Sequence, residues 1–366
     1  MKEICFITGS RSEVGALITI VDSLIARGEY LDYKILIHGA HNLALFGNTQ
    51  NELSKRFPSK SIIVKTIFES TKGNCDIFTR TVSVIYEVLL AEKISHVFII
   101  GDRIESYASA ISAHLCGAKI YHYGGGNISR GSNDNIYRFN ITNLSHVHFT
   151  TSKPAYDRLL SLPTIDRRNI HCAGSSSVDS IISFLTAPER IGTYYPQLED
   201  NKYALITFHP DIYDTYNVAE LLNLVIQNVI NNGLKALVTY PNHDFGYEKI
   251  IQVIESWRSN ASVVIVKHLG KQKYFSAIYS SRYVIGNTSS GFVEVPYFGK
   301  VFYNVGCRQE GRDADPYVKN LDSSAALISH ELKQLEHVSE MENCTCSMIY
   351  GNGNASDRII DILNEN

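Results

Sequence analysis

The fold is decided by the stretch ICFITGSR at residues 4–11. Residues 4–8 are a short apolar run that predicts a β-strand, and Gly9 indicates a turn directly after it. In residues 14–26 the apolar positions then recur with the spacing of a helix. A strand, a turn and a helix in this order are typical of the βαβ unit, in which helices join parallel strands.

The same alternation of strand and helix patterns recurs along the chain in two series. The first series predicts further strands at residues 34–38, 97–100, 119–123, 147–150 and 170–172. The second series predicts strands at residues 203–208, 236–240, 263–266, 283–285 and 301–304. Between the two series, the polar and proline-bearing stretch 188–201 is interpreted as a linker.

These two series predict an α/β fold with two Rossmann-like domains, each built on a parallel sheet. The length of 366 residues supports two domains, because a chain of this size exceeds one comfortable hydrophobic core. We place the N-terminal domain at residues 1–187, the C-terminal domain at residues 202–345 and a C-terminal helix within residues 346–366. The sequence leaves open whether this last helix crosses back to the first domain.

Composition and charge exclude several classes of protein. With 34 basic and 37 acidic side chains the net charge is −3, so nucleic acid is not an expected partner. The sequence shows no membrane-spanning apolar run and no signal-peptide pattern, so a cytoplasmic protein is expected. The seven cysteines, at positions 5, 75, 116, 172, 307, 344 and 346, lack the paired C-x-x-C spacing of a zinc site. We therefore expect reduced cysteines and no metal.

Residues that directly follow the predicted strands are candidates for a site, because open parallel α/β sheets bind ligands beyond the carboxyl ends of their strands. Arg11, after the first strand, is either a forked cation for a phosphate group or a surface arginine. Its turn lacks the G-x-G-x-x-G pattern, so a dinucleotide site is not supported. Asp102, in GDRIE at residues 101–105, is interpreted either as a catalytic carboxylate or as a helix N-cap.

The densest group of polar residues is YHYGGGNISRGSNDNIYR at residues 121–138. Its three consecutive glycines, directly after a strand, allow the backbone to approach a ligand closely. Asp134 and Arg138 stand one helical turn apart and form either a surface salt bridge or part of a site. A polar loop of this length beside a cleft is more often functional than not.

The second series contributes its own strand-end residues. His209 follows a strand and precedes a proline, so it is either a structural histidine or one whose imidazole faces a ligand in the expected cleft. The stretch GNTSSG at residues 286–291 offers small hydroxyl groups and amides that suit an anion, without the lysine of a P-loop. Glu294 can accept hydrogen bonds from ribose hydroxyls. Arg308 and Arg312, after the next strand, either add positive charge or are solvated surface residues.

Taken together, the segments TGSRSE, GDRIE, AGSSSVD, TFHP, TYPN, GNTSSGFVEVPYFGK and RQEGR, in this order, resemble the hydrolysing UDP-N-acetylglucosamine 2-epimerase family, including its sialic-acid and legionaminic-acid branch. The resemblance implies a GT-B architecture, with two Rossmann-like domains that face a UDP-sugar cleft. It also implies a UDP-sugar substrate, no metal or redox cofactor, and a homodimer as a common state. The N-terminal domain is then the sugar side and the C-terminal domain binds UDP.

The resemblance also implies roles for single residues. Candidate catalytic residues are Asp102, Asp134 and His209. Candidate substrate-binding residues are Arg11, Arg138, Ser289, Ser290, Gly291, Glu294, Arg308 and Arg312. In the family reaction a base removes the C2 proton while UDP leaves C1, and water then adds to the resulting 2-acetamidoglucal. Such chemistry needs a base and an acid at the sugar, and donors for the leaving diphosphate.

The sequence departs from the family pattern on the sugar side. Gly126 stands where the sialic-acid branch usually has a glutamate, Asn135 where it has an acidic residue, and Val14 where it has an early aromatic residue. We predict a hydrolysing 2-epimerase of a UDP-N-acetylated hexosamine, which releases UDP and the free 2-epimeric sugar for surface-glycan synthesis. The alternatives are a diverged GT-B glycosyltransferase, a UDP-sugar hydrolase, or a UDP-sugar-binding protein without turnover.

Overall fold

The computed structural model describes residues 3–28, 31–43, 49–67, 73–211, 217–242, 244, 246–321, 330 and 346–365. Its contacts divide the chain into two compact units. Unit 1 comprises Met1–Asn127, Asn133–Asp179 and Tyr350–Asn366, and unit 2 comprises Ile128–Ser132 and Ser180–Ile349. Cys344, one of the seven cysteines expected to be reduced, lies outside the described residues.

Unit 1 contains a parallel sheet with the strand order β3-β2-β1-β4-β5-β6-β7. Its strands are β1 (Glu3–Thr8), β2 (Asp32–Ile37), β3 (Ser61–Ile63), β4 (His96–Ile100), β5 (Lys119–Tyr123), β6 (Val147–Thr150) and β7 (Ile170–Cys172). Its helices are α1 (Arg11–Arg27), α2 (Thr49–Arg56), α3 (Asn74–Ala91), α4 (Ile104–Leu115), α5 (Asp134–Leu144), α6 (Lys153–Leu160) and α13 (Ala355–Glu365). This order is that of the Rossmann fold, whose switch point lies between β1 and β4.

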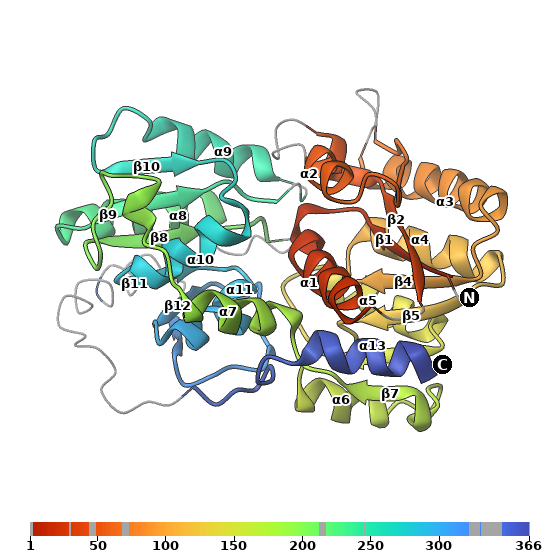
Figure 1. Ribbon diagram of the computed structural model, residues 1–366. Coiled ribbons are helices and arrows are strands. Elements are labelled where there is room, and N and C mark those ends of the chain that lie inside the picture. Colours follow the sequence, from red (N-terminus) through yellow and green to blue (C-terminus); the bar gives the residue numbers. More distant parts are fainter. Residues whose placement is uncertain are drawn as a thin grey trace. The chain divides into compact units, whose positions relative to one another are not determined.

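The two faces of this sheet are covered by different helices. Apolar residues of α1 and α13 pack in one cluster with alternate side chains of β1, β4 and β5. Figure 1 shows α1 and α13 side by side over that face. Residues of α3, α4 and α5 pack on the opposite face. A parallel sheet buried on both faces explains why a central strand such as β4 is an almost uninterrupted apolar run.

Unit 2 repeats the plan with the strand order β10-β9-β8-β11-β12-β13, so its switch point lies between β8 and β11. Its strands are β8 (Tyr203–Thr207), β9 (Lys235–Thr239), β10 (Val263–Val266), β11 (Tyr283–Gly286), β12 (Phe302–Val305) and β13 (Val318–Leu321). Its helices are α8 (Val218–Asn231), α9 (Tyr247–Ser256), α10 (Gly270–Ser280) and the single-turn α11 (Ser290–Val293). All pairs in both sheets are parallel.

Two details correct the organisation predicted from the sequence, and a third concerns the last helix, whose place the sequence left open. The stretch 188–201 is no linker, because Ile191 and Leu198 are buried in the core of unit 2. The boundary between the units lies instead inside α7 (Ser176–Thr186), after Asp179. Helix α13 belongs to unit 1, where the Asp179 carboxylate accepts the first backbone N–H groups of α13, those of Ala355 and Ser356.

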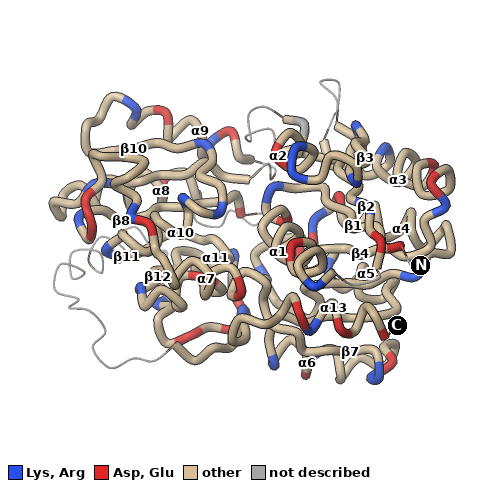
Figure 2. Tube along the Cα trace, in the orientation of Figure 1, with Lys and Arg blue, Asp and Glu red and all other residues tan. Residues whose placement is uncertain are grey.

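The predicted strands begin and end within two residues of those in the structure, but β3 and β13 were missed. Figure 2 shows basic and acidic positions interspersed along both units, as the small net charge suggests. Among the described helices, none combines the length and apolarity that a membrane span requires.

Candidate functional site

Residues at the switch point of unit 1 form the first group of candidates. Arg11 is the first residue of α1 and is half-buried. The turn before it needs glycine, since a Cβ on Gly9 would lie 2.5 Å from Cβ of Glu105. Helix α1 begins at Arg11 rather than at the predicted residue 14. The reason is that Glu13 accepts a hydrogen bond from the N–H of the N-cap Ser10.

Glu13 itself was missed as a site residue, although its spacing from Ser10 fits a capping box. Its carboxyl group is buried and accepts four hydrogen bonds. Oε2 accepts from the Thr8 hydroxyl and the N–H groups of Gly9 and Ser10, at 2.8, 2.8 and 3.2 Å. Oε1 accepts from the Ser106 hydroxyl at 2.8 Å. Burial raises the pKa of Glu13 to about 7.

Asp102 follows β4 and is held by a buried arginine. The Arg138 guanidinium is 1% exposed and donates from Nε to Asp102 Oδ2 at 3.0 Å and from an Nη to the same oxygen. Its other Nη donates to the carbonyl of Asn127 at 2.9 Å and to Asn135 Oδ1 at 2.6 Å. Asp102 is not the N-cap of α4, because Arg103 occupies that position. The Asp134–Arg138 pair is no surface salt bridge, which was the alternative raised from the sequence, because Arg138 is buried.

His122 fixes the strand end from which Asp102 projects. Its Nε2 lies 2.9 Å from the carbonyl of Gly101, and its Nδ1 lies 3.1 Å from the Thr142 hydroxyl. A carbonyl only accepts, so Nε2 carries the hydrogen. Burial lowers the pKa of His122 to about 4, which leaves the ring neutral near pH 7. Asp134, the first residue of α5, is half-buried at a helix N-terminus, where the helix dipole favours a carboxylate.

Gly126 has a steric reason to be glycine. Its φ is +81°, and a Cβ there would lie 2.4 Å from the carbonyl oxygen of Ala155 and 3.1 Å from Cγ of Leu159. The Arg158 guanidinium also donates to the Gly126 carbonyl at 3.0 Å. In this backbone arrangement residue 126 cannot carry a glutamate without movement of α6.

Residues at the switch point of unit 2 form the second group. Asn287 joins the ends of β8 and β11: its Oδ1 accepts from the N–H of His209 at 2.7 Å, and its Nδ2 donates to the carbonyl of His209 at 2.8 Å. The backbone N–H of Asn242 donates to Nδ1 of His209 at 3.1 Å. A neutral His209 therefore carries its hydrogen on Nε2 and acts as a donor. This tautomer favours binding of an anion over service as a base.

The hydroxyl-rich turn after β11 is held by close packing. Ser289 precedes α11, and Ser290 shares hydrogen bonds with the hydroxyls of Tyr274 and Thr288. Gly291 fits because a Cβ would lie 2.2 Å from the ring of Phe302. Glu294 ends the short helix and is half-buried.

Arg308 and Arg312 differ in their surroundings. Arg308 is buried and donates to the carbonyls of Pro210 and Asn287 at 3.2 and 3.3 Å, with Asp244 Oδ2 at 3.6 Å. It therefore braces the loops after β8 and β11 and is no solvated surface residue. Arg312 is half-buried and donates to Gln309 Oε1 at 3.1 Å.

Arg11 and Asp102 thus follow the paired strands β1 and β4 of unit 1, and His209 and the Ser289–Ser290 turn follow the paired strands β8 and β11 of unit 2. Sequence reasoning missed Glu13 and Asn287. In the part of the chain that the structure describes, no three His, Cys, Asp or Glu side chains gather in a way that could hold a metal. The Cys307 thiol near Asp211 has its pKa raised to about 11, mainly by burial, so it is not an activated nucleophile.

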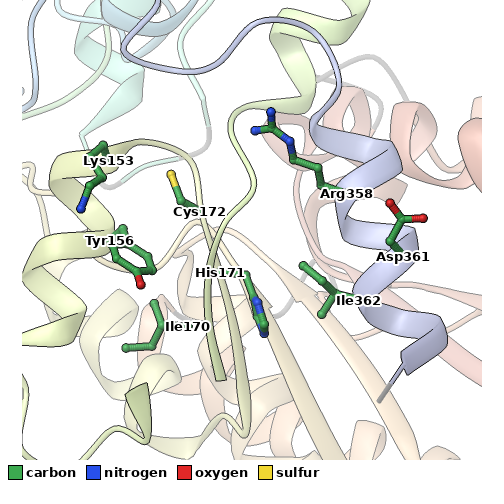
Figure 3. A pocket seen from close by; sticks show the side chains of 8 residues that line it. All are labelled: Lys153, Tyr156, Ile170, His171, Cys172, Arg358, Asp361 and Ile362. Atoms are coloured by element: carbon green, nitrogen blue, oxygen red, sulfur yellow. The ribbon is translucent and has the colours of Figure 1, made fainter. Parts of the chain in front are cut away.

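A cavity of about 650 Å³ lies elsewhere in unit 1, between α6, β7 and α13. Figure 3 shows its lining side chains, Lys153, Tyr156, Ile170, His171, Cys172, Arg358, Asp361 and Ile362. None of the predicted site residues lines it.

The two parallel sheets, with polar residues at both switch points, define a protein of the GT-B-like α/β class. The family model for UDP-N-acetylglucosamine 2-epimerase matches residues 24–364, so the chain belongs to this family. The resemblance stated from the sequence is confirmed.

Relatives and solved structures agree with this assignment. The chain is 27% identical over 366 residues to a UDP-N,N'-diacetylbacillosamine 2-epimerase (hydrolyzing) of Legionella pneumophila, covering 99% of this chain and 96% of that protein. It is 25% identical over 336 residues to a UDP-N-acetylglucosamine 2-epimerase of Neisseria meningitidis, covering 91% of this chain and 87% of that protein. Its fold matches the crystal structure of the N. meningitidis UDP-GlcNAc 2-epimerase bound to UDP-GlcNAc, with a TM-score of 0.84, 18% identity and full coverage of both chains.

Proposed function

We propose that this protein is a hydrolysing 2-epimerase of a UDP-N-acetylated hexosamine, which releases UDP and the free 2-epimeric sugar. The observation that carries the proposal is the Asp102 carboxylate, held at the switch point of unit 1 by the buried Arg138. The family assignment and the hydrolyzing relative of L. pneumophila support it. Release of the sugar for surface-glycan synthesis is part of the same proposal.

In this proposal each unit contributes a different part of the chemistry. In unit 2, the Nε2–H of His209, the Ser289 hydroxyl and the amides of the following turn bind the diphosphate, and Glu294 accepts from the ribose. Arg11 supplies positive charge from unit 1. Donors of this kind are required because the leaving diphosphate gains charge as the bond to C1 breaks.

Asp102 and Asp134 supply the base and the acid at the sugar. One carboxylate removes the C2 proton, the C2–H electrons form the C1–C2 double bond, and the C1–O bond breaks toward UDP. Water then adds at C1 of the 2-acetamidoglucal while C2 takes a proton on the opposite face. Arg138, assigned to substrate by the sequence, is proposed instead to position Asp102, and Arg308 to brace the UDP loops.

The test is turnover of UDP-GlcNAc and UDP-N,N'-diacetylbacillosamine in D₂O, followed by NMR of the released sugar. We expect UDP release with deuterium at C2. Asp102→Asn should lower kcat by about 10²–10⁴-fold, because a positioned acid or base is lost. Asp76→Asn, which breaks an ion pair with Arg80 on α3, should leave kcat unchanged.

The alternatives give different results in this experiment. Released sugar without deuterium indicates a UDP-sugar hydrolase. No release at all indicates either a glycosyltransferase that needs an acceptor, or a protein that binds the UDP-sugar without turnover. Either result overturns the proposed function. The cytoplasmic location and the homodimer remain predictions.

A further inference from the structure

Glu13 lies in unit 1 without a role in the chemistry proposed above. Its side chain is 3% exposed, yet its carboxyl group accepts four hydrogen bonds. Three donors, Thr8, Gly9 and Ser10, belong to the turn that ends β1, directly before Arg11. An acceptor with this many donors fixes the backbone around it, because each donor left unpaired in a buried place costs about 1–3 kcal/mol.

The same carboxyl group also contacts the turn that ends β4. Ser106, in the first turn of α4, donates to Glu13 Oε1 at 2.8 Å. Gly101, directly before Asp102, lies against the carboxyl group, since a Cβ at residue 101 would be 3.8 Å from Oε1. One buried side chain therefore touches the turns that present Arg11 and Asp102.

We propose that Glu13 is a positioning residue that ties the turn of Arg11 to the turn of Asp102, so that both side chains meet the UDP-sugar in a fixed arrangement. The inference rests on the proposed function, which assigns Arg11 and Asp102 to that substrate. Its importance follows from geometry, because a displacement of about 1 Å at a reacting group can cost about 10²-fold in rate.

The hydrogen bonds around Glu13 accommodate either charge state. The Ser106 hydroxyl lies 2.8 Å from Glu13 Oε1 and 3.3 Å from the carbonyl of Ile100. When Oε1 takes up a proton, it donates to Ser106, and Ser106 turns its own hydrogen toward Ile100. All these polar atoms keep a partner, so protonation does not break the link between the two turns.

Titratable groups from several elements face Glu13. Burial raises the pKa of Glu13 more than its hydrogen bonds from Gly9, Ser106 and Thr8 lower it, and the charge of Glu105 on α4 raises it further. His41 lies 2.9 Å from the Thr8 hydroxyl, and His38 lies beside Gly9. Burial lowers the pKa of His41 to about 4 and that of His38 to about 3, so both rings stay neutral while Glu13 changes charge near pH 7.

Three variants test the inference. Glu13→Gln has the shape of the protonated side chain, Glu13→Ala removes all four acceptor contacts, and Asp179→Ala is the matched control, a carboxylate that accepts two backbone N–H groups of α13 instead. We expect Glu13→Ala to lower kcat by about 10²-fold with a small change in KM. Glu13→Gln should keep its activity and the wild-type pH profile between pH 6 and 8, because protonation of Glu13 leaves the link between the two turns intact. Asp179→Ala should keep both kcat and the pH profile.

Hydrogen exchange supplies a readout that does not need turnover. In Glu13→Ala, backbone amides in residues 8–12 and 100–106 should lose protection together, whereas Asp179→Ala should not affect them. A wild-type protein without turnover refutes the proposed function, and the exchange result then decides the inference alone. If the wild type is active, a Glu13→Ala variant with wild-type kcat, pH profile and exchange overturns the inference and leaves the proposed function intact.

Discussion

At the scale of single residues, Gly126 shows how a sequence pattern and a structure can give different reasons for one residue. By sequence it is a position that has lost a glutamate. In the structure its positive φ and the 2.4 Å approach to the Ala155 carbonyl leave no space for any side chain. The local backbone therefore explains why this position has no glutamate. A simple Gly126→Glu substitution cannot restore one without moving α6.

We predict that Gly126→Ala destabilises unit 1 more than Gly117→Ala does. Both glycines have positive φ, so each substitution costs about 1–3 kcal/mol in backbone strain. A Cβ on Gly117 meets nothing within 4 Å, whereas one on Gly126 meets the backbone of α6. Urea unfolding of both variants measures the difference. Equal decreases in the free energy of unfolding would show that α6 moves to accommodate a side chain at this position without a further energetic cost.

Site residues that directly follow an apolar strand could be predicted from the sequence, because the carboxyl ends of parallel strands meet at one edge. Arg11, Asp102 and His209 were predicted in this way, and their roles remain predictions. Glu13 and Asn287 were missed because their roles come from hydrogen-bond partners that only the folded chain brings near. Arg308 was found, but its burial beneath the loops was not, since no local pattern separates a bracing arginine from an exposed one.

At the scale of elements, most strands that the sequence predicted are buried apolar runs, although the edge strands β7 and β10 were predicted as well. The two that it missed, β3 and β13, are three and four residues long and lie at the sheet edges. Lys319 and Asn320 in β13 are exposed, so no apolar run marks that strand. These segments become strands by pairing with β2 and β12. Tertiary pairing, rather than propensity, decides their structure.

The attachment of α13 to unit 1 gives a prediction at this scale. Asp179 accepts the N–H groups of Ala355 and Ser356 at 2.9 and 2.7 Å, as an N-cap does. Asp179→Ala should lower the free energy of unfolding by about 0.5–2 kcal/mol. Asp22→Ala, which removes only an exposed ion pair with Arg56, should change it by about 0–1 kcal/mol. Thermal or urea unfolding measures the stability of both variants. Equal decreases in the free energy of unfolding would contradict the capping role of Asp179.

At the scale of the whole molecule, four buried histidines in unit 1 should govern acid stability. Burial lowers the pKa of His38 and His148 to about 3, and that of His41 and His122 to about 4. Unfolding returns each to about 6.5, so the unfolded chain binds more protons at intermediate pH. Stability that is present above pH 6.5 is therefore lost as the pH falls toward 4.

Glu13 works in the opposite direction. Its folded pKa of about 7 exceeds its ordinary 4.5, so its contribution is present below pH 4.5 and is lost as the pH rises toward 7. One such group does not balance four histidines, and acid should destabilise the protein between pH 6.5 and 4.

A single histidine can be isolated in this titration. His148 is 2% exposed and its Nδ1 has no hydrogen-bond partner, so His148→Leu should retain the fold. It should reduce the slope of unfolding free energy against pH by up to about 1.4 kcal/mol per pH unit. His114→Gln, on an exposed position of α4, serves as the control. A slope unchanged in His148→Leu would rule out this histidine as a source of acid sensitivity.

Helix α13 has a consequence for how the chain is made. Its side chains Ile359, Ile360 and Leu363 cover apolar residues of α1, including Leu17 and Val21. Translation produces α1 early and α13 after every other described element. During synthesis the ribosome therefore carries a unit 1 whose apolar flank is still bare, and all of unit 2 emerges before that flank can be closed. Apolar surface that stays exposed during synthesis makes an incomplete chain prone to aggregation.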